Sequence, residues 1–128
     1  SAAQAPVSLK ALEAHPQISA QAAYAQSKLA LTMWSFYLAE QHPEVAVLAV
    51  NPGSLLNTNM VKEAFGRFWA PADKGGQILY DLAILDQYRG VTGKYFDNDA
   101  GDFGYAHADA DDPEKVAALI QKTEEIVG

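Results

Sequence analysis

Cysteine is absent from the 128 residues, which excludes disulfides and thiolate zinc sites. Its absence is compatible with a reducing compartment, and we expect a cytoplasmic protein. The longest apolar run, residues 45–50, is far shorter than the ~18 residues of a membrane-spanning helix, so no membrane partner is expected. Basic residues are few, with 9 Lys and Arg against 16 Asp and Glu. The net charge of −7 argues against a nucleic-acid partner.

Clusters of metal ligands are also missing. The histidines have no mutual ligand spacing, so we expect surface or capping roles for all three: His15, His42 and His107. Residues 97–99 resemble the start of a calcium loop, but Asp102 stands where that loop needs glycine and Ala108 where it needs glutamate. We therefore expect no metal site and interpret residues 97–112 as a solvated acidic loop.

A glycine-rich phosphate-binding turn is not found either. Such a turn joins a strand to the N-terminus of a helix, where the backbone approaches a pyrophosphate. Gly75-Gly76 lies in a stretch with helical composition, and Gly101 and Gly104 lie in the acidic segment. Neither pair follows an expected strand. These 128 residues are therefore not expected to hold a dinucleotide alone.

A long helix and an apolar strand dominate the central part of the chain. Residues 21–41 are rich in helix formers and contain neither Gly nor Pro. His42-Pro43 should end this helix, because the residue before a proline avoids helical angles. Residues 44–50 show no polar alternation, which predicts a central parallel strand covered on both faces. A helix that feeds a strand through a short loop is half of a βαβ unit, so we expect an α/β fold.

The remaining predicted elements are shorter. They are a helical turn at 8–14, an irregular segment or small helix at 58–68, a helix at 73–87, a strand at 94–96 and a helix at 112–126. Asp112 should cap the last helix, with Pro113 at its first helical position.

Tyr24 and Lys28 carry the clearest chemical signal. Residues i and i+4 lie on one face of a helix, about 6 Å apart along its axis. An ammonium at that distance favours the phenolate form, which suits Tyr24 to reversible proton transfer with a carbonyl oxygen. A Tyr and a Lys at this spacing also occur by chance on exposed helix faces. The context favours the chemical interpretation, because the helix is followed by an apolar strand that ends in Asn51-Pro52-Gly53.

The segments Tyr24-Ala-Gln-Ser-Lys28 and Asn51-Pro-Gly-Ser-Leu-Leu56, with Gly93-Lys-Tyr-Phe-Asp-Asn-Asp99, resemble the short-chain dehydrogenase/reductase family. The resemblance covers essentially the whole chain and is greatest to the retinol dehydrogenase and protochlorophyllide reductase subgroup. It implies the C-terminal half of a doubly wound Rossmann-type parallel sheet. Residues 1–128 would be the catalytic half of one domain, without the N-terminal dinucleotide-binding half. The implied activity is NAD- or NADP-dependent interconversion of a carbonyl and an alcohol.

The resemblance also implies roles for individual residues. Tyr24 would be the general acid and base, and Lys28 would tune it and bind the nicotinamide ribose. The usual serine position, thirteen residues before the tyrosine, is Ala11 here. Ser1 fits the longer spacing of the subgroup and would bind the substrate carbonyl.

The expected cofactor contacts follow the apolar strand. Pro52 and Gly53 would lie against the nicotinamide ring, and the backbone of Leu55 would meet its carboxamide. The family commonly has threonine five residues after the proline. Here that position is Asn57 and Thr58 follows, so either residue could make this contact.

Two further expectations concern partners. Phe65, Phe68 and Trp69 lie where the family has a mobile substrate lid, although core packing explains aromatic residues equally well. A fully apolar strand needs neighbours on both edges, so we expect association with the missing half or with another copy in a homo-oligomer. The alternative function is non-catalytic: a binding or oligomerisation module, or a cofactor-sensing relative. The sequence upstream of Ser1 would discriminate between these possibilities.

Overall fold

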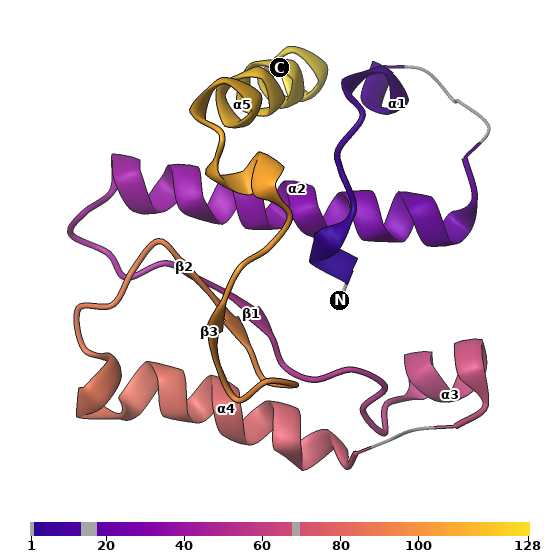
Figure 1. Cartoon of the computed structure of the whole chain (residues 1–128), viewed down its shortest axis with the longest axis vertical. Coiled ribbons are helices and arrows are strands. Elements are labelled where there is room, and N and C mark those ends of the chain that lie inside the picture. The colour runs from indigo at the N-terminus through magenta and orange to yellow at the C-terminus, as the bar shows by residue number, and fades with distance from the viewer. Residues whose placement is uncertain (1, 14–17, 68–69) are drawn as a thin grey trace.

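The computed structural model describes residues 2–13, 18–67 and 70–128, which form an α/β fold (Figure 1). The α-helices are α1 (Leu9–Glu13), α2 (Ala20–Gln41), α3 (Asn59–Phe65), α4 (Ala72–Ile84) and α5 (Pro113–Val127). The strands are β1 (Leu48–Asn51), β2 (Lys94–Asp97) and β3 (Asp102–Gly104). Short 3-10 helices are η1 (Ala2–Gln4), η2 (Asp86–Tyr88) and η3 (Ala108–Asp111).

The three strands form a small mixed sheet in the order β1-β2-β3. β1 pairs in parallel with β2, with Ala49 opposite Tyr95, as expected of a βαβ-type connection. β2 pairs antiparallel with β3, with Phe96 opposite Phe103. The interpretation of residues 97–112 as a loop was therefore wrong in part. The Phe103 ring packs edge-to-face on Phe96, with centroids 5.1 Å apart, and stabilises a strand too short to show a periodicity.

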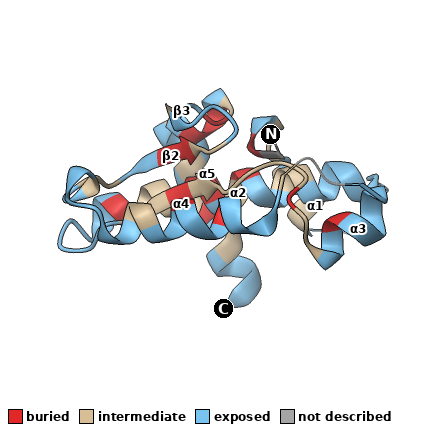
Figure 2. Ribbon diagram, turned by 90° about the horizontal axis from the view of Figure 1, so that it is seen from below, coloured by how far each residue is buried: buried red, intermediate tan, exposed pale blue. Residues whose placement is uncertain are grey.

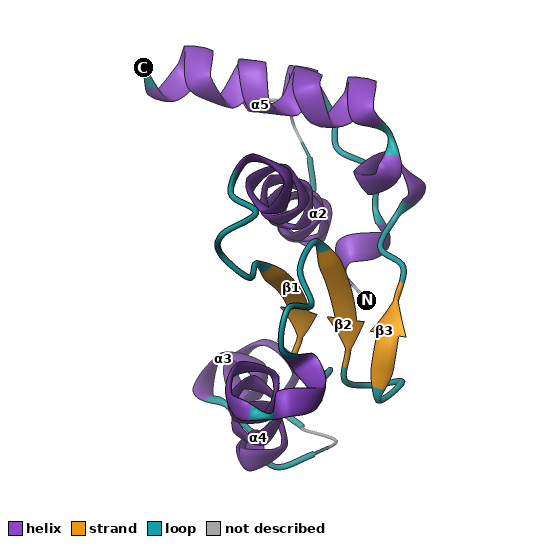
Figure 3. Cartoon of the chain, turned by 90° about the vertical axis from the view of Figure 1, so that its left-hand side faces the viewer, coloured by secondary structure: helices purple, strands orange, loops and turns teal. Residues whose placement is uncertain are grey.

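The elements stack in layers, with α5 over α2, α2 over the sheet, and α3 with α4 beneath it (Figure 3). α2 thus lies between the sheet and α5, and its buried residues are Leu29, Thr32, Met33 and Ala39. Its Leu29 and Met33 belong to the core, together with Tyr95 of β2 and Leu119 of α5. Figure 2 shows mostly exposed residues on α3 and α4, where only Val61, Gly75 and Ile78 are buried.

β1 is shorter than predicted. The strand begins at Leu48 rather than at residue 44, and Val45 is 51% exposed. β1 pairs with β2 on one side, and no other strand of the described residues pairs with its second edge. Helices lie on both sides of the sheet and no residue of β1 is exposed, so the prediction of two covered faces is confirmed. A central position of β1 is not shown, because among the described residues it has a strand partner on one edge only.

The helix ends agree well with the sequence. The Ser19 hydroxyl caps α2 by accepting from the Ala22 backbone N–H at 3.1 Å. Asp112 caps α5 and Pro113 occupies its first turn, both as predicted. α4 spans Ala72–Ile84 and includes Gly75 and Gly76, and residues 86–88 continue as η2 instead of the same helix.

Candidate functional site

Tyr24 and Lys28 lie on one face of α2, near its N-terminal end. The Lys28 Nζ is 5.3 Å from the centroid of the Tyr24 ring. Tyr24 is 47% exposed, so a small molecule can reach the phenol. The hydroxyl of Ser27, between the two residues, donates to the Tyr24 carbonyl oxygen at 2.7 Å. The predicted pairing of a phenol with an ammonium is thus present on an accessible surface.

The chain turns sharply after β1, in residues 51–55, which we call the strand-end loop. Gly53 has φ +139°, and a Cβ there would lie 2.8 Å from Leu56 Cδ2. Glycine is therefore required by backbone angle and by space. Leu55 has φ +48°, a left-handed conformation that costs a non-glycine residue about 1 kcal/mol or more. The loop holds a backbone shape that needs support from its surroundings.

Helix α4 supplies part of that support through Gly75. A Cβ on Gly75 would lie 2.6 Å from Leu56 Cδ1 and 3.4 Å from Pro52 Cβ. Its neighbour Gly76 has no such atom within 4 Å. Gly75 therefore lets the chain after β1 pack closely on α4. Sequence reasoning noted both glycines without a role for either, because a close approach between segments leaves no local signal.

The turn after β2 also supports the strand-end loop. We call residues 97–99 the acidic turn. Asp99 accepts hydrogen bonds from the Ser54 backbone N–H at 2.9 Å, from the Ser54 hydroxyl, and from Asn51 Nδ2 at 3.0 Å. Asp97 accepts from the same Asn51 amide at 2.8 Å and from the Asp99 N–H at 3.1 Å. Both carboxylates thus accept hydrogen bonds from groups of the chain, and their partners in the strand-end loop are Asn51 and Ser54.

The environment of Asp99 favours its ionised form. Partial burial raises the pKa of this carboxyl, but the hydrogen bonds from Ser54 and Asn51 and the charge of Lys74 outweigh burial. The net result is a pKa below the ordinary value of 3.8. Asp99 is therefore an acceptor of hydrogen bonds throughout the neutral pH range.

Asn98 joins three segments. Its Nδ2 donates to the Pro52 carbonyl oxygen at 2.9 Å and to the Lys74 carbonyl oxygen in α4 at 3.3 Å. Its backbone N–H donates to the Asn51 carbonyl oxygen at 3.0 Å. Sequence reasoning missed Asn98 and Asp99 as site residues. The signal that could have found them is their position directly after β2, since the carboxyl ends of parallel strands meet at one edge.

Asn57 and Thr58 have local structural roles. The Thr58 hydroxyl caps α3 by accepting from the Val61 N–H at 3.3 Å. The Asn57 N–H donates to the Ala70 carbonyl oxygen at 2.8 Å. Its side-chain Oδ1 is buried and has no hydrogen-bond partner among the described residues, an arrangement that typically costs about 1–3 kcal/mol. The contact of either residue with a cofactor stays a prediction.

The N-terminal turns of α2 and the strand-end loop lie at the same end of the molecule. Figure 1 shows the start of α2 on the side towards which the chain leaves β1 for α3. This is the carboxyl end of the two parallel strands, where open α/β sheets bind ligands. We regard Tyr24, Lys28, the strand-end loop and the acidic turn as the candidate site.

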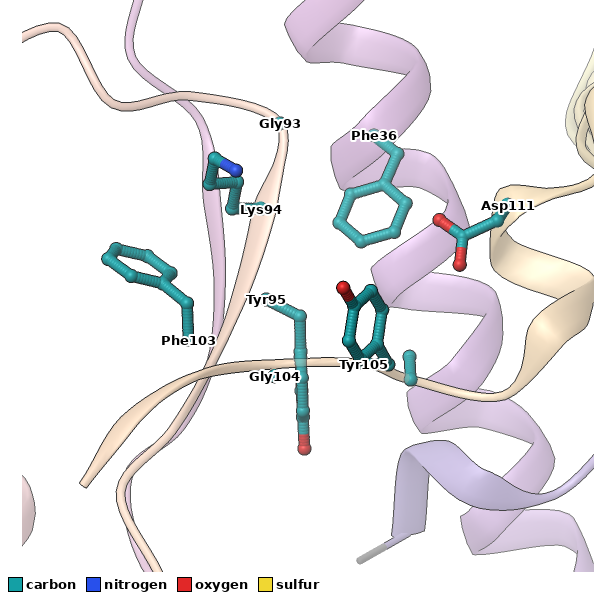
Figure 4. A pocket seen from close by; sticks show the side chains of 9 residues that line it. Phe36, Gly93, Lys94, Tyr95, Phe103, Gly104, Tyr105 and Asp111 are labelled. Carbon is teal, nitrogen blue, oxygen red and sulfur yellow. The ribbon is translucent and has the colours of Figure 1, made fainter. Parts of the chain in front are cut away.

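Two hollows in the surface lie elsewhere. One of about 230 Å³ is at the amino end of β2, where Phe36, Tyr105 and Asp111 come from different segments (Figure 4). The other, of about 500 Å³, lies between β1 and α4. Neither is lined by Tyr24, Lys28 or the strand-end loop. We place the site by the Tyr24–Lys28 pair and by the hydrogen bonds between the strand-end loop and the acidic turn.

Several predicted residues remain without structural support. Ser1, Phe68 and Trp69 lie outside the described residues. Phe65 ends α3 and is 63% exposed, so it is not part of the core. His15 also lies outside the described residues. The other two histidines have the expected roles: the exposed His42 ring contacts Glu44 at 3.1 Å, and His107 caps η3.

Within the described ranges, no group of three or more His, Cys, Asp or Glu side chains is placed to hold a metal ion. No helix there is both long enough and apolar enough to cross a membrane. No family model, curated protein or solved structure matches this chain.

Proposed function

We propose that this chain is the catalytic half of a short-chain dehydrogenase/reductase that interconverts a carbonyl and an alcohol. The observation that carries the proposal is the accessible Tyr24 ring with the Lys28 ammonium 5.3 Å from its centroid, at the strand end that holds the glycine-dependent loop. Tyr24 Oη would donate a proton to the carbonyl oxygen of the substrate during reduction and accept it during oxidation. Lys28 would stabilise the phenolate that this transfer creates.

The residues present fit the nicotinamide end of a cofactor. NAD or NADP would supply or accept the hydride. Gly53 and Leu55 shape a backbone that would lie against the ring and its carboxamide, and Lys28 would bind ribose hydroxyls. The phosphate end is different, because no glycine-rich strand-turn-helix occurs among the 128 residues. We propose that another polypeptide segment provides it.

The second edge of β1 has no strand partner among the described residues, which supports the proposal of a larger sheet. Val47 and Asn51 direct their carbonyl oxygens towards β2, where the backbone N–H groups of Gly93 and Asn98 donate to them. Backbone groups alternate along a strand, so Leu48 and Val50 direct theirs away from β2. Beside this edge lies the apolar hollow of about 500 Å³. We propose that a further strand, from the N-terminal half or from another copy, pairs here and completes a doubly wound parallel sheet.

The test of the catalytic proposal is Tyr24→Phe in the longest natural polypeptide that contains these residues. Oxidation of NADH and NADPH by a panel of aldehydes and ketones would be followed by absorbance. Loss of the acid/base group should lower turnover by about 10²-fold or more, with nucleotide affinity largely retained. Tyr80→Phe is the matched control, because Tyr80 is an exposed tyrosine on α4. Full activity of Tyr24→Phe would refute the assignment.

The same edge of β1 also favours a second candidate, a non-catalytic association module. Unpaired edges and exposed apolar side chains drive assembly in their own right. Light scattering and NADPH titration separate the two candidates. Assembly without nucleotide binding or turnover in the longest natural polypeptide would favour the module.

A further inference from the structure

We propose that Asn98 and Asp99 are positioning residues that clamp the strand-end loop in the conformation that meets the ligand. The clamp itself is independent of the chemistry, whereas its effect on a ligand rests on the proposed function. Neither residue is assigned a contact with the reacting atoms. They act through the backbone of residues 51–54.

The clamp reaches consecutive polar groups of the loop. The Asn51 and Pro52 carbonyl oxygens accept from Asn98, and the Ser54 N–H donates to Asp99. The Gly53 N–H donates to Asn51 Oδ1 at 3.2 Å, and the amide of that same side chain donates to the acidic turn. Each residue from 51 to 54 therefore has a hydrogen bond that leads directly or through Asn51 to the acidic turn.

The two clamp residues have opposite hydrogen-bonding roles. Asn98 Nδ2 meets two carbonyl oxygens, from Pro52 and Lys74, so only a donor serves there. Asp99 meets an N–H, an O–H and an amide NH₂, so only an acceptor serves there. A solvated acidic loop would not require a donor at position 98 and an acceptor at position 99. These two requirements distinguish asparagine from aspartate at both positions, although the two side chains have nearly the same shape.

The loop needs such a restraint because its backbone is strained. Leu55 has φ +48° and directly follows the last clamped residue. Without the clamp, the chain could relax towards more common angles and move the backbone of Gly53 and Leu55. The Asn98 bond to the Lys74 carbonyl also joins the loop to α4, so loop and helix are held as one unit.

The first test measures the clamp alone. Asp99→Asn replaces one of the two accepting carboxylate oxygens by an NH₂ group that can only donate, and Asn98→Asp replaces the donating NH₂ by an oxygen that can only accept. We expect amide hydrogen exchange at Gly53 and Ser54 to accelerate about tenfold or more in either variant, with little change in the core of α2. The control Asp86→Asn removes the same charge from an exposed side chain that pairs with nearby Arg89 at 2.7 Å. Unchanged exchange at both amides in the folded Asp99→Asn variant would overturn the clamp.

The second test measures its consequence in the longest natural polypeptide. We expect Asp99→Asn to lower kcat about tenfold while KM for the carbonyl substrate changes less than about twofold, because the loop orients the nicotinamide side. Ser54→Ala removes one of the three donors to Asp99 and should have a smaller effect, which keeps the test decisive if Asp99→Asn does not fold. Wild-type kcat in both variants would overturn the positioning role. Absence of any nucleotide turnover in the unaltered protein would instead remove the proposed function, and hydrogen exchange would still decide the clamp.

Discussion

Helices α2 and α4 lie on opposite sides of the same sheet, but they are buried to different degrees. α2 is enclosed by the sheet and by α5, and Leu29 is 0% exposed. α4 leaves Leu79, Tyr80 and Ile84 exposed and borders a hollow of about 500 Å³ beside β1. The α2 side thus has a finished core, whereas the α4 side has apolar surface that further structure could cover. Close packing on α4 occurs at Gly75, next to the candidate site.

The largest expected effect contrasts leucines on the two helices. Leu29→Ala should lower the free energy of unfolding by about 2–5 kcal/mol, because it opens a cavity in a filled core. Leu79→Ala should change it by about 0.5 kcal/mol or less, because Leu79 is 52% exposed. Urea denaturation followed by circular dichroism measures both. Equal losses would mean that the α4 face is covered in solution.

A smaller effect on stability should distinguish the two adjacent glycines of α4, Gly75 and Gly76. Gly75→Ala should destabilise by about 1–3 kcal/mol, because its Cβ meets Leu56, which already lies against Gly53. Gly76→Ala should stabilise by about 0.5–1 kcal/mol, because its Cβ meets open space in a helix. Thermal unfolding of both variants measures the difference. Stabilisation by both substitutions would show that the strand-end loop does not pack closely on α4.

The smallest effect is the pH dependence of the contact between the acidic turn and the loop. Because the pKa of Asp99 is lowered on folding, its ionised form contributes stability above the ordinary value of 3.8. This contribution is lost as the pH falls through the lowered value. The charged groups that face it are Asp97 in the same turn and Lys74 on α4.

The difference in Tm between the unaltered chain and Asp99→Asn should therefore be present at neutral pH and shrink below about pH 3.8. Asp86→Asn, at an exposed surface side chain, is the control for the loss of one negative charge. A difference that stays constant through acid pH would contradict the ionised contact.

Local signals predicted a large part of this structure. The limits of α2, the Asp112 cap of α5 and the shared face of Tyr24 and Lys28 depend on residues only a few positions apart. The acidic turn was interpreted as a solvated loop, because its contacts are with residues far away in the sequence. Its Asn98 contacts the Pro52 carbonyl oxygen across 46 positions of sequence, which no periodicity or capping pattern reports.

The sequence by itself determined the long helices, the existence of strands near residues 48–50 and 94–96, the Tyr24–Lys28 face and the break at Pro52-Gly53, because these follow from periodicity and backbone preference within short segments. Only the tertiary structure decided that β1 pairs with a strand on one edge alone within the described part of the chain, that residues 102–104 form a strand, and that Gly75, Asn98 and Asp99 hold the strand-end loop. Those features are contacts between distant segments. Their energies arise only when folding brings the partners within hydrogen-bonding or van der Waals distance.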